Sequence, residues 1–331
     1  MKVTAVAPSN IALIKYWGRR DDKLVLPYNG SISVTLDKLL TKTTVEFSRD
    51  YKKDEIVING ERVTGEKLKR ALNFINFIRR ISGEESPVRV VSENNFPTAA
   101  GLASSASGFS ALALACSNAL DLNLSDREVS ILARMSGSGS AARSLFGGFV
   151  EWHRGKRSDG SDSYAEQIAN ETHWKDFRIL VSILTTLEKK ISSADGMRYT
   201  VKTSPFYTGW LKTIKNDLRI VKSSIRKRDF TNLGKTSEHN CLKMHALMIS
   251  TVPSLIYWMP STLEVMHKVM ELRRDGLECY FTIDAGPNVK VLCLKEDVKK
   301  IKKRLKELKS IKELVEARPG RGAYLSKKHL F

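Results

Sequence analysis

Residues 94–107 read NNFPTAAGLASSAS, a turn containing proline and glycine that leads into a helix of alanine and serine. Small side chains let a ligand approach the backbone closely, and the first turn of a helix presents unpaired N–H groups and a positive dipole end. Ser104 and Ser105 add hydroxyl groups for phosphate oxygens or a divalent cation. The segment therefore has the physics of a phosphate-binding loop, although it matches neither the Walker A nor the GxGxxG pattern. A helix that needs small residues for close packing explains it equally well.

N-terminal to this loop, residues 7–20 read APSNIALIKYWGRR and combine a strand-like run with cations and aromatic rings. Lys15 and Arg19 lie beside Tyr16 and Trp17 in the chain. Cations next to aromatic rings on a short segment suit an anionic organic ligand. A surface lysine followed by a core tryptophan is the structural alternative.

C-terminal to the loop, residues 136–148 read SGSGSAARSLFGG. Alternating glycine and serine can offer several N–H and O–H donors to an anion. Arg143 follows directly as a fixed charge that binds carboxylate or phosphate in a bidentate manner. A flexible turn is the alternative, and the presence of Arg143 weakens it.

The fourth conspicuous segment is residues 281–290, FTIDAGPNVK. The expected strand ends at Asp284, which is followed at once by alanine, glycine and proline. A carboxylate at a strand end beside a tight turn is a frequent position for a catalytic base. An ordinary turn aspartate is the alternative.

Hydrophobic periodicity predicts strands and helices in both halves of the chain. The expected strands are 2–7, 31–36, 42–48, 88–92, 148–152, 180–184, 279–284 and 289–294. The expected helices are 67–81, 103–120, 126–135, 208–227, 232–250 and 261–274. Ser125 and Glu128 form a predicted capping box before the third of these helices. The alternation predicts two α/β or α+β lobes that divide near residues 175–195.

Composition limits the function classes. The 331 residues carry 55 Lys and Arg against 36 Asp and Glu, a formal charge of +19 that suits polyanionic ligands. Part of the excess lies in a lysine-rich C-terminal run, where Val298, Ile301, Leu305 and Leu308 predict a solvated amphipathic helix. The longest uncharged stretch is interrupted by prolines, and the N-terminus has no apolar signal segment, so we expect no membrane span and a cytoplasmic location. The scattered cysteines predict buried, reduced thiols.

Together these segments resemble the diphosphomevalonate decarboxylase family, a branch of the superfamily of galactokinase, homoserine kinase, mevalonate kinase and phosphomevalonate kinase. The strings that carry the resemblance, in order, are SNIALIKYWG, SENNFPTAAGLASSASGF, SGSGSAARSLFGGFVEW, SSADGM and FTIDAGPNVK. They run from the N-terminus to about residue 294. Two departures are visible: Arg19 stands where the family usually has lysine, and Ala142 where it has cysteine or serine.

The resemblance implies an α+β, two-lobed fold. Residues 1–185 would form an N-terminal α/β domain of the ribosomal-protein domain-2-like type that binds ATP. Residues 186–331 would form a ferredoxin-like domain. The implied reaction uses ATP and Mg²⁺ to phosphorylate the 3-hydroxyl of mevalonate 5-diphosphate, after which the 3-phosphate leaves and the carboxylate is lost as carbon dioxide. A homodimer is also a family expectation.

The resemblance also implies roles for individual residues. Asp284 would orient or deprotonate the 3-hydroxyl, Arg143 would hold the carboxylate, and Lys15 would stabilise the transferring phosphoryl group. The implied substrate contacts are Tyr16, Arg19, Arg70, Ser92, Ser138, Gly139, Ser140 and Met197. The implied ATP and phosphate contacts are Asn10, Pro97, Ala100, Gly101, Leu102, Ala103, Ser104 and Ser105, with Ser105 also a ligand of Mg²⁺.

Two other interpretations remain at this point. A relative with the same fold could decarboxylate mevalonate 5-phosphate, or phosphorylate the 3-hydroxyl without decarboxylation. A nucleic-acid-binding protein would also suit the +19 charge. The lysine-rich run has no interleaved aromatic residue until Tyr324, however, so we expect no nucleic-acid partner.

Overall fold

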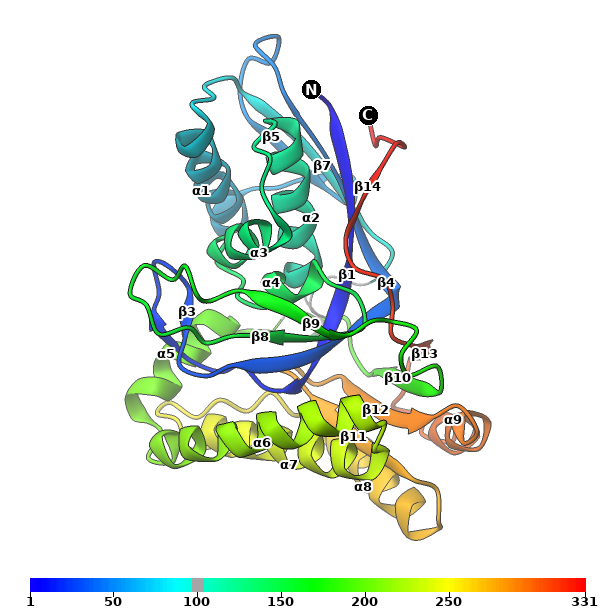
Figure 1. Ribbon diagram of the computed structural model, residues 1–331. Helices are drawn as coiled ribbons and strands as arrows, with labels where there is room; N and C mark the ends of the chain where they lie inside the picture. Colours follow the sequence, from blue (N-terminus) through cyan, green and yellow to red (C-terminus); the bar gives the residue numbers. More distant parts are fainter. Residues whose placement is uncertain (97–103, 188) are drawn as a thin grey trace.

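The computed structural model describes residues 1–96, 104–187 and 189–331, which form two lobes stacked one above the other in Figure 1. Each lobe is built on its own sheet, and helices cover those sheets. The mixed α+β, two-lobed fold expected from the sequence is confirmed.

Two long strands, β1 (Val3–Ile14) and β4 (Ser31–Phe47), form the centre of the first sheet. They pair antiparallel from Val3 opposite Val45 to Ile14 opposite Ile32, with two register shifts. The described strands follow the order β14-β1-β4-β7-β5-β6, and β8 and β9 extend the sheet from β4. The remaining bounds are β5 (Glu55–Ile58), β6 (Glu61–Arg62), β7 (Val88–Asn94), β8 (Phe149–Trp152), β9 (Ala165–Ala169) and β14 (Tyr324–Ser326). A separate ribbon pairs β2 (Arg19–Asp21) with β3 (Leu26–Pro27).

The strands predicted at 31–36 and 42–48 are one continuous strand, β4. Leu39 and Thr41 are buried, while Lys38 before them is exposed and Leu40 between them is partly exposed, so the strand alternation continues through the linking residues. One half of β4 pairs with β8 and the other with β7. The prediction was wrong because charged residues on the exposed face of a long strand look like a break.

Helix α2 (Ser104–Ala119) packs on β1 and β4. Its buried positions are mostly alanine and serine, which lets the helix lie close to the sheet and brings its first turn near the middle of the molecule. Helix α3 (Asp126–Met135) begins with the predicted Ser125–Glu128 capping box, which is confirmed. The first lobe also contains α1 (Gly65–Ser82) and the single turn α4 (Ala141–Ser144).

The second sheet is antiparallel, with the order β11-β12-β10-β13 among the described residues. Its strands are β10 (Phe177–Ile183), β11 (Cys279–Ile283), β12 (Val289–Leu294) and β13 (Glu313–Ala317). Its helices are α5 (Ser193–Thr203), α6 (Tyr207–Lys227), α7 (Phe230–Ile249), α8 (Pro260–Arg274) and α9 (Val298–Lys306). Helices α7 and α8 pack on β11. The lysine-rich helix α9 ends before Leu308, and the sequence did not predict the strand β13 that follows it.

One apolar core joins the two sheets. Ile11, Ile32 and Phe149 of the first sheet share a cluster with Phe177 of β10 and Phe230 of α7. The second half of β1 therefore runs between the lobes and is buried throughout. A division of the chain into 1–185 and 186–331 remains a proposal.

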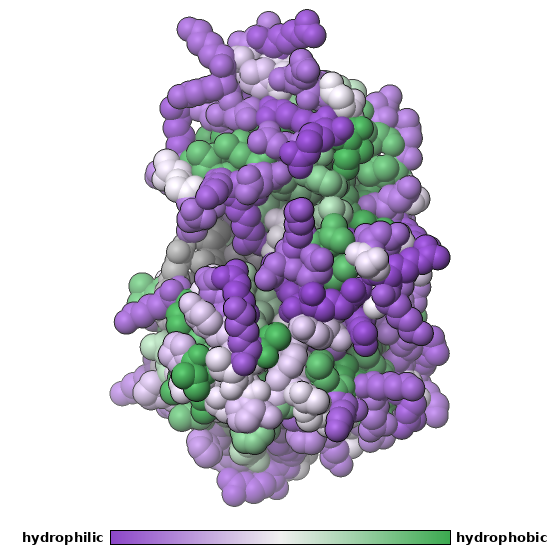
Figure 2. Space-filling view, turned by 90° about the vertical axis from the view of Figure 1, so that its left-hand side faces the viewer, coloured by the Kyte–Doolittle hydropathy of each residue, from purple (hydrophilic) through white to green (hydrophobic). Residues whose placement is uncertain are grey.

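The surface is strongly charged. Figure 2 shows hydrophilic side chains over most of one face, with apolar side chains gathered in smaller groups. Within the described residues, no helix combines the length and apolar character that a membrane span requires. All four cysteines are buried and free, as the sequence predicted.

Candidate active site

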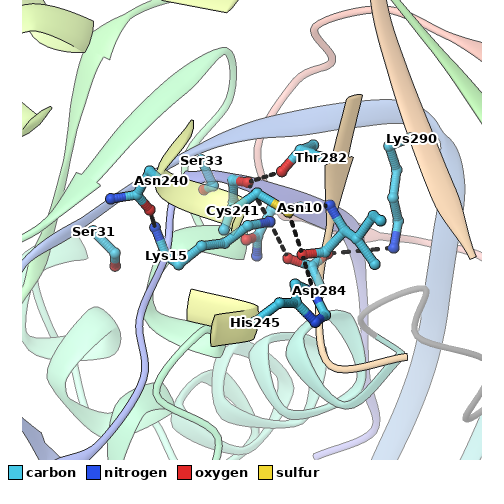
Figure 3. Close-up of polar contacts among 12 residues, drawn as sticks. Asn10, Lys15, Ser31, Ser33, Asn240, Cys241, His245, Thr282, Asp284 and Lys290 are labelled. Carbon is cyan, nitrogen blue, oxygen red and sulfur yellow. Dashed lines mark hydrogen bonds and ion pairs between the residues drawn. The ribbon is translucent and has the colours of Figure 1, made fainter. Parts of the chain in front are cut away.

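Asp284 directly follows β11, and its carboxylate lies between two lysines whose side chains are almost fully buried (Figure 3). The Nζ atom of Lys15 is 2.7 Å from Oδ1, and Nζ of Lys290 is 3.4 Å from Oδ2. Burial alone would raise the pKa of Asp284, but the two lysine charges together outweigh it and hold the pKa well below its usual range. The carboxylate is therefore ionised at any physiological pH and can accept hydrogen bonds.

Lys15 reaches this position from the end of β1, 269 residues away in the chain. Its Nζ also donates to the carbonyl oxygen of Ala12 at 2.9 Å, which fixes the side chain along its own strand. The shared apolar core holds β1 against the second sheet, and so it places a lysine of the first lobe beside an aspartate of the second.

Two further lysines of the site were missed by the sequence reasoning. Lys290 lies opposite Thr282 in the β11–β12 hairpin, so the register of that hairpin brings it to Asp284. Lys189 donates to Ser193 Oγ at 2.5 Å and to the carbonyl oxygen of Ala285 at 2.9 Å. Burial lowers the pKa of Lys189 to about 8. The Gly-Pro turn could have signalled Lys290, because it implies a hairpin, whereas no comparable pattern marks Lys189.

Arg143, on α4, is buried without a carboxylate partner among the described residues. Its guanidinium donates to neutral oxygens: to Ser33 Oγ at 2.9 Å, to Ser31 Oγ at 2.5 Å and to Asn10 Oδ1 at 3.2 Å. Burial lowers the pKa of Arg143 to about 10. A buried cation with only neutral partners is costly, and an anionic group of a ligand would compensate its charge.

Asn10 lies beside Arg143 and α4. Its Oδ1 accepts from Arg143, while its Nδ2 donates to Ser144 Oγ at 2.8 Å and to the carbonyl oxygen of Ser140 at 3.1 Å. These contacts tie β1 to the loop around α4 and orient the guanidinium. An ATP contact of Asn10 remains a prediction.

A second group of cations surrounds Gly137. Arg19 donates to the carbonyl oxygen of Gly137 at 2.8 Å and to the hydroxyl of Tyr16 at 2.9 Å. The guanidinium of Arg70 lies over the Phe109 ring, and a Cβ atom at Gly137 would be 3.2 Å from Arg70 Nε. Gly137 has φ +88°, a conformation that favours glycine. Arg19 and Arg70 thus converge on one loop, as a polyphosphate site requires.

The serine side chains of this loop face the start of α2. Ser138 Oγ is 3.4 Å from Ser105 Oγ and 3.3 Å from Ser140 Oγ. A Cβ atom at position 139 would lie 2.4 Å from the Trp152 ring, so only glycine fits there without displacing the ring. Glycine therefore lets the loop pack against Trp152 while its hydroxyl groups stay together.

The remaining predicted site residues are less directly connected. Ser92 Oγ pairs with Thr43 Oγ at 2.9 Å inside the first sheet, and no described contact joins it to Asp284 or Arg143. Met197 packs in the apolar cluster that contains Trp17. Ser104 begins α2. Five predicted ATP contacts lie outside the described residues: Pro97, Ala100, Gly101, Leu102 and Ala103.

This arrangement suits phosphoryl transfer to a hydroxyl group of an acidic substrate. It combines an ionised carboxylate, several buried cations and a hydroxyl-rich loop at a helix start. The two-lobed fold and this site together define the protein as an enzyme of the small-molecule-kinase type.

The chain belongs to the diphosphomevalonate decarboxylase family. Residues 7–165 match the family described as diphosphomevalonate decarboxylase-like N-terminal domain. Residues 179–324 match the mevalonate 5-diphosphate decarboxylase C-terminal domain. The two matches together cover nearly the whole chain, and so the resemblance expected from the motifs is confirmed.

Individual relatives agree with the family match. The diphosphomevalonate decarboxylase of Homo sapiens is 39% identical over 89% of this chain and 78% of the human protein. The structure of the mevalonate diphosphate decarboxylase from Enterococcus faecalis is 43% identical, with a TM-score of 0.92 over 99% of both chains. A structure described as MDDEF in complex with MVAPP, AMPPCP and magnesium has the same identity, TM-score and coverage.

Proposed function

We propose that this protein converts mevalonate 5-diphosphate and ATP to isopentenyl diphosphate, ADP, phosphate and carbon dioxide. The observation that carries the proposal is a pair of charged sites close enough for the charge of Asp284 to act on Arg143. Asp284 is held between Lys15 and Lys290, and nearby Arg143 is buried without an anionic partner among the described residues. The first site suits a hydroxyl that accepts a phosphoryl group, and the second suits a carboxylate that is lost. The relatives that match nearly the full chain carry the same activity in their names.

In the first step the 3-hydroxyl of the substrate attacks the terminal phosphoryl group of ATP. Asp284 accepts a hydrogen bond from this hydroxyl and fixes its direction. The low pKa of Asp284 favours orientation over early proton removal, which agrees with a loose transition state that needs little base assistance. Lys15 and Lys189 supply positive charge close to Asp284, where the transferred group acquires negative charge.

Magnesium bound with the nucleotide neutralises phosphate charge. The oxygen ligands that Mg²⁺ prefers are available at the start of α2, where Ser105 Oγ faces Ser138 Oγ. We propose Ser105 as the side chain that holds this ion. The backbone at Ser104 and the preceding loop would bind the nucleotide phosphates.

In the second step Arg143 holds the substrate carboxylate in line for its loss. The bond between the carboxylate carbon and C2 breaks, and its electron pair forms the double bond between C2 and C3. The C3–O bond breaks with its pair going to the departing phosphate, so that carbon dioxide and inorganic phosphate leave together. A kinase that stops at the phosphorylated product has no need for this arginine.

The diphosphate would lie against the loop around Gly137, where Arg19 and Arg70 converge. We propose the following further substrate contacts: Tyr16, Ser92, Ser138, Gly139, Ser140 and Met197.

Product analysis tests the proposal. The protein is incubated with ATP, Mg²⁺ and, separately, mevalonate, its 5-phosphate and its 5-diphosphate. Carbon dioxide and isopentenyl diphosphate from the diphosphate are the expected result. Turnover of the monophosphate alone, or a stable 3-phosphorylated product without carbon dioxide, would overturn the proposed function and leave the fold unaffected.

We further propose a homodimer and a cytoplasmic location. Phe206, Val252 and Ile256 are exposed apolar residues, and hydrogen bonds hold the end of α5 to the segment that follows α7. An apolar surface of this kind suits contact with a second copy. The free, buried cysteines suit a reducing compartment. Sedimentation of the purified protein and fractionation of its host cells test the two proposals.

A further inference from the structure

Lys15 lies just beyond the last residue of β1, where the strand ladder no longer supplies partners for its backbone. Two side-chain amides take over this role. The backbone N–H of Lys15 donates to Asn240 Oδ1 at 2.8 Å, and its carbonyl oxygen accepts from Asn29 Nδ2 at 2.7 Å. Both asparagines are buried, with exposures of 0% and 3%. The backbone on either side of the Lys15 side chain is therefore held by one residue 14 positions away and by another 225 positions away.

Asn240 is itself oriented from one side. Its Nδ2 donates to Asp217 Oδ2 at 2.7 Å, and Asp217 on α6 is nearly buried. A carboxylate can only accept hydrogen bonds, so it selects the NH₂ end of the amide and turns the oxygen toward Lys15. Asp217 also accepts from Lys243 Nζ at 2.5 Å, on the outer side of the pair. Figure 3 shows Asn240 on one side of Lys15 and Asp284 on the other.

We propose that Asp217 and Asn240 are positioning residues of the reaction, which act through the backbone of Lys15. Their described contacts reach Lys15 and not Asp284 or Arg143. They would fix the point from which the lysine side chain extends to the carboxylate 2.7 Å away. This inference rests on the proposed function, because it assigns the pair to the step that uses Lys15.

The hydrogen bond between the two residues can be reversed, which provides a sharp test. Asn240→Asp keeps an acceptor for the Lys15 N–H but places a second carboxylate oxygen against Asp217. We expect kcat to fall about 10²-fold, because a displacement of about 1 Å in a catalytic group has this effect. Combining it with Asp217→Asn restores the contact with donor and acceptor exchanged, and we expect kcat to recover to within about fivefold of the wild type.

The split between kinetic constants separates positioning from substrate binding. The KM values for ATP and for mevalonate 5-diphosphate should change less than about threefold in Asn240→Asp, because the arginines that face the substrate are untouched. Lys243→Met is the matched control, since it removes the outer partner of Asp217 and a contact with Thr213 but leaves the hydrogen bond from Asn240 to Asp217, and kcat of the folded variant should stay within about twofold. Asp217→Ala, which frees the Asn240 amide to rotate, should lower kcat about tenfold with unchanged KM.

The proposal is overturned if Asn240→Asp folds and retains wild-type kcat, or if the double variant melts like the wild type and yet stays as slow as Asn240→Asp alone. If Asn240→Asp fails to fold, Asp217→Ala and the double variant decide by the same criteria. Release of ADP is measured together with release of carbon dioxide. Absence of carbon dioxide from the wild type would overturn the proposed function, while the order of ADP rates among the variants would still test the positioning pair.

Discussion

Replacing Asp284 with asparagine removes the negative charge that Lys15 and Lys290 share. At an effective dielectric constant of about 20, the separations of 2.7 and 3.4 Å correspond to Coulomb energies of about 6 and about 5 kcal/mol before desolvation is considered. Measured losses for one broken buried pair are about 3–5 kcal/mol. A buried lysine can also release its proton, which limits the cost to about 5 kcal/mol per lysine at pH 7. We therefore expect Asp284→Asn to lose about 3–5 kcal/mol of unfolding free energy.

The loss should depend on pH in a defined direction. Burial already lowers the pKa of Lys290, and Asp284 opposes this effect, so the pKa falls further in the variant. The folded variant then binds fewer protons than its unfolded chain at pH values below the ordinary lysine pKa of about 10.4. Its stability accordingly rises relative to the wild type as the pH increases from 7 toward 10. The difference in unfolding free energy between the wild type and Asp284→Asn should therefore be smaller at about pH 9.5 than at about pH 7, and urea unfolding at both pH values measures it.

Activity provides the second readout, and the Asp284→Asn change is measured both alone and together with Lys290→Met. Carbon dioxide release by Asp284→Asn should fall about 10²–10⁴-fold, because the variant loses the carboxylate that accepts a hydrogen bond from the reacting hydroxyl and fixes its direction. Adding Lys290→Met should restore part of the stability, because it removes one of the two buried cations that lost the Asp284 carboxylate, but it should not restore the activity. A stability loss below about 1 kcal/mol, a gap that widens with pH, or activity within tenfold of the wild type would refute the charge-sharing argument.

Three further outcomes follow from the site. Arg143→Gln should lower carbon dioxide release about 10²-fold or more and reduce the ratio of carbon dioxide to ADP, and an unchanged ratio would contradict the carboxylate role. The kcat/KM for ATP should fall as the pH rises through about 8, because Lys189 loses its proton there. Lys189→Arg should move this decline to higher pH, since arginine stays charged. A pH profile identical to that of the wild type would exclude Lys189 as the cause of the decline. Gly139→Ala, whose Cβ meets the Trp152 ring, should cost about 1–3 kcal/mol in thermal or urea unfolding. Gly209→Ala on α6 has open space and should be neutral or stabilising by up to about 1 kcal/mol.

Several features of the fold could be predicted because their causes are local. The Ser125–Glu128 capping box needs only four consecutive residues, and the helices of the second lobe follow from apolar periodicity. The prediction of two separate strands within β4 was wrong because the cause of its continuity is not local. Its continuity depends on β7 and β8, which pair with its two halves and come from later parts of the chain.

Some residues of the candidate site could likewise be predicted from local sequence, and others could not. The motifs identified Lys15, Arg143 and Asp284 because each lies in a short segment of unusual composition, and the structure brings Lys15 to Asp284. Lys189 lacks such a segment, and Asn240 lies within an ordinary amphipathic helix. Their positions near the site result from packing between elements, which no local pattern records.

The sequence by itself determined the family, the alternation of strands and helices, and the residue types that the chemistry needs, because these depend on neighbours a few positions apart. Only the tertiary structure decided which charges face one another. The apolar core shared by both sheets carries the end of β1 to the end of β11, and this contact depresses the pKa of Asp284. The folded chain also buries Arg143 among neutral partners and brings the backbone N–H of Lys15 to Asn240 Oδ1. Electrostatic interactions between residues more than 200 positions apart depend on packing, and so on the folded chain as a whole.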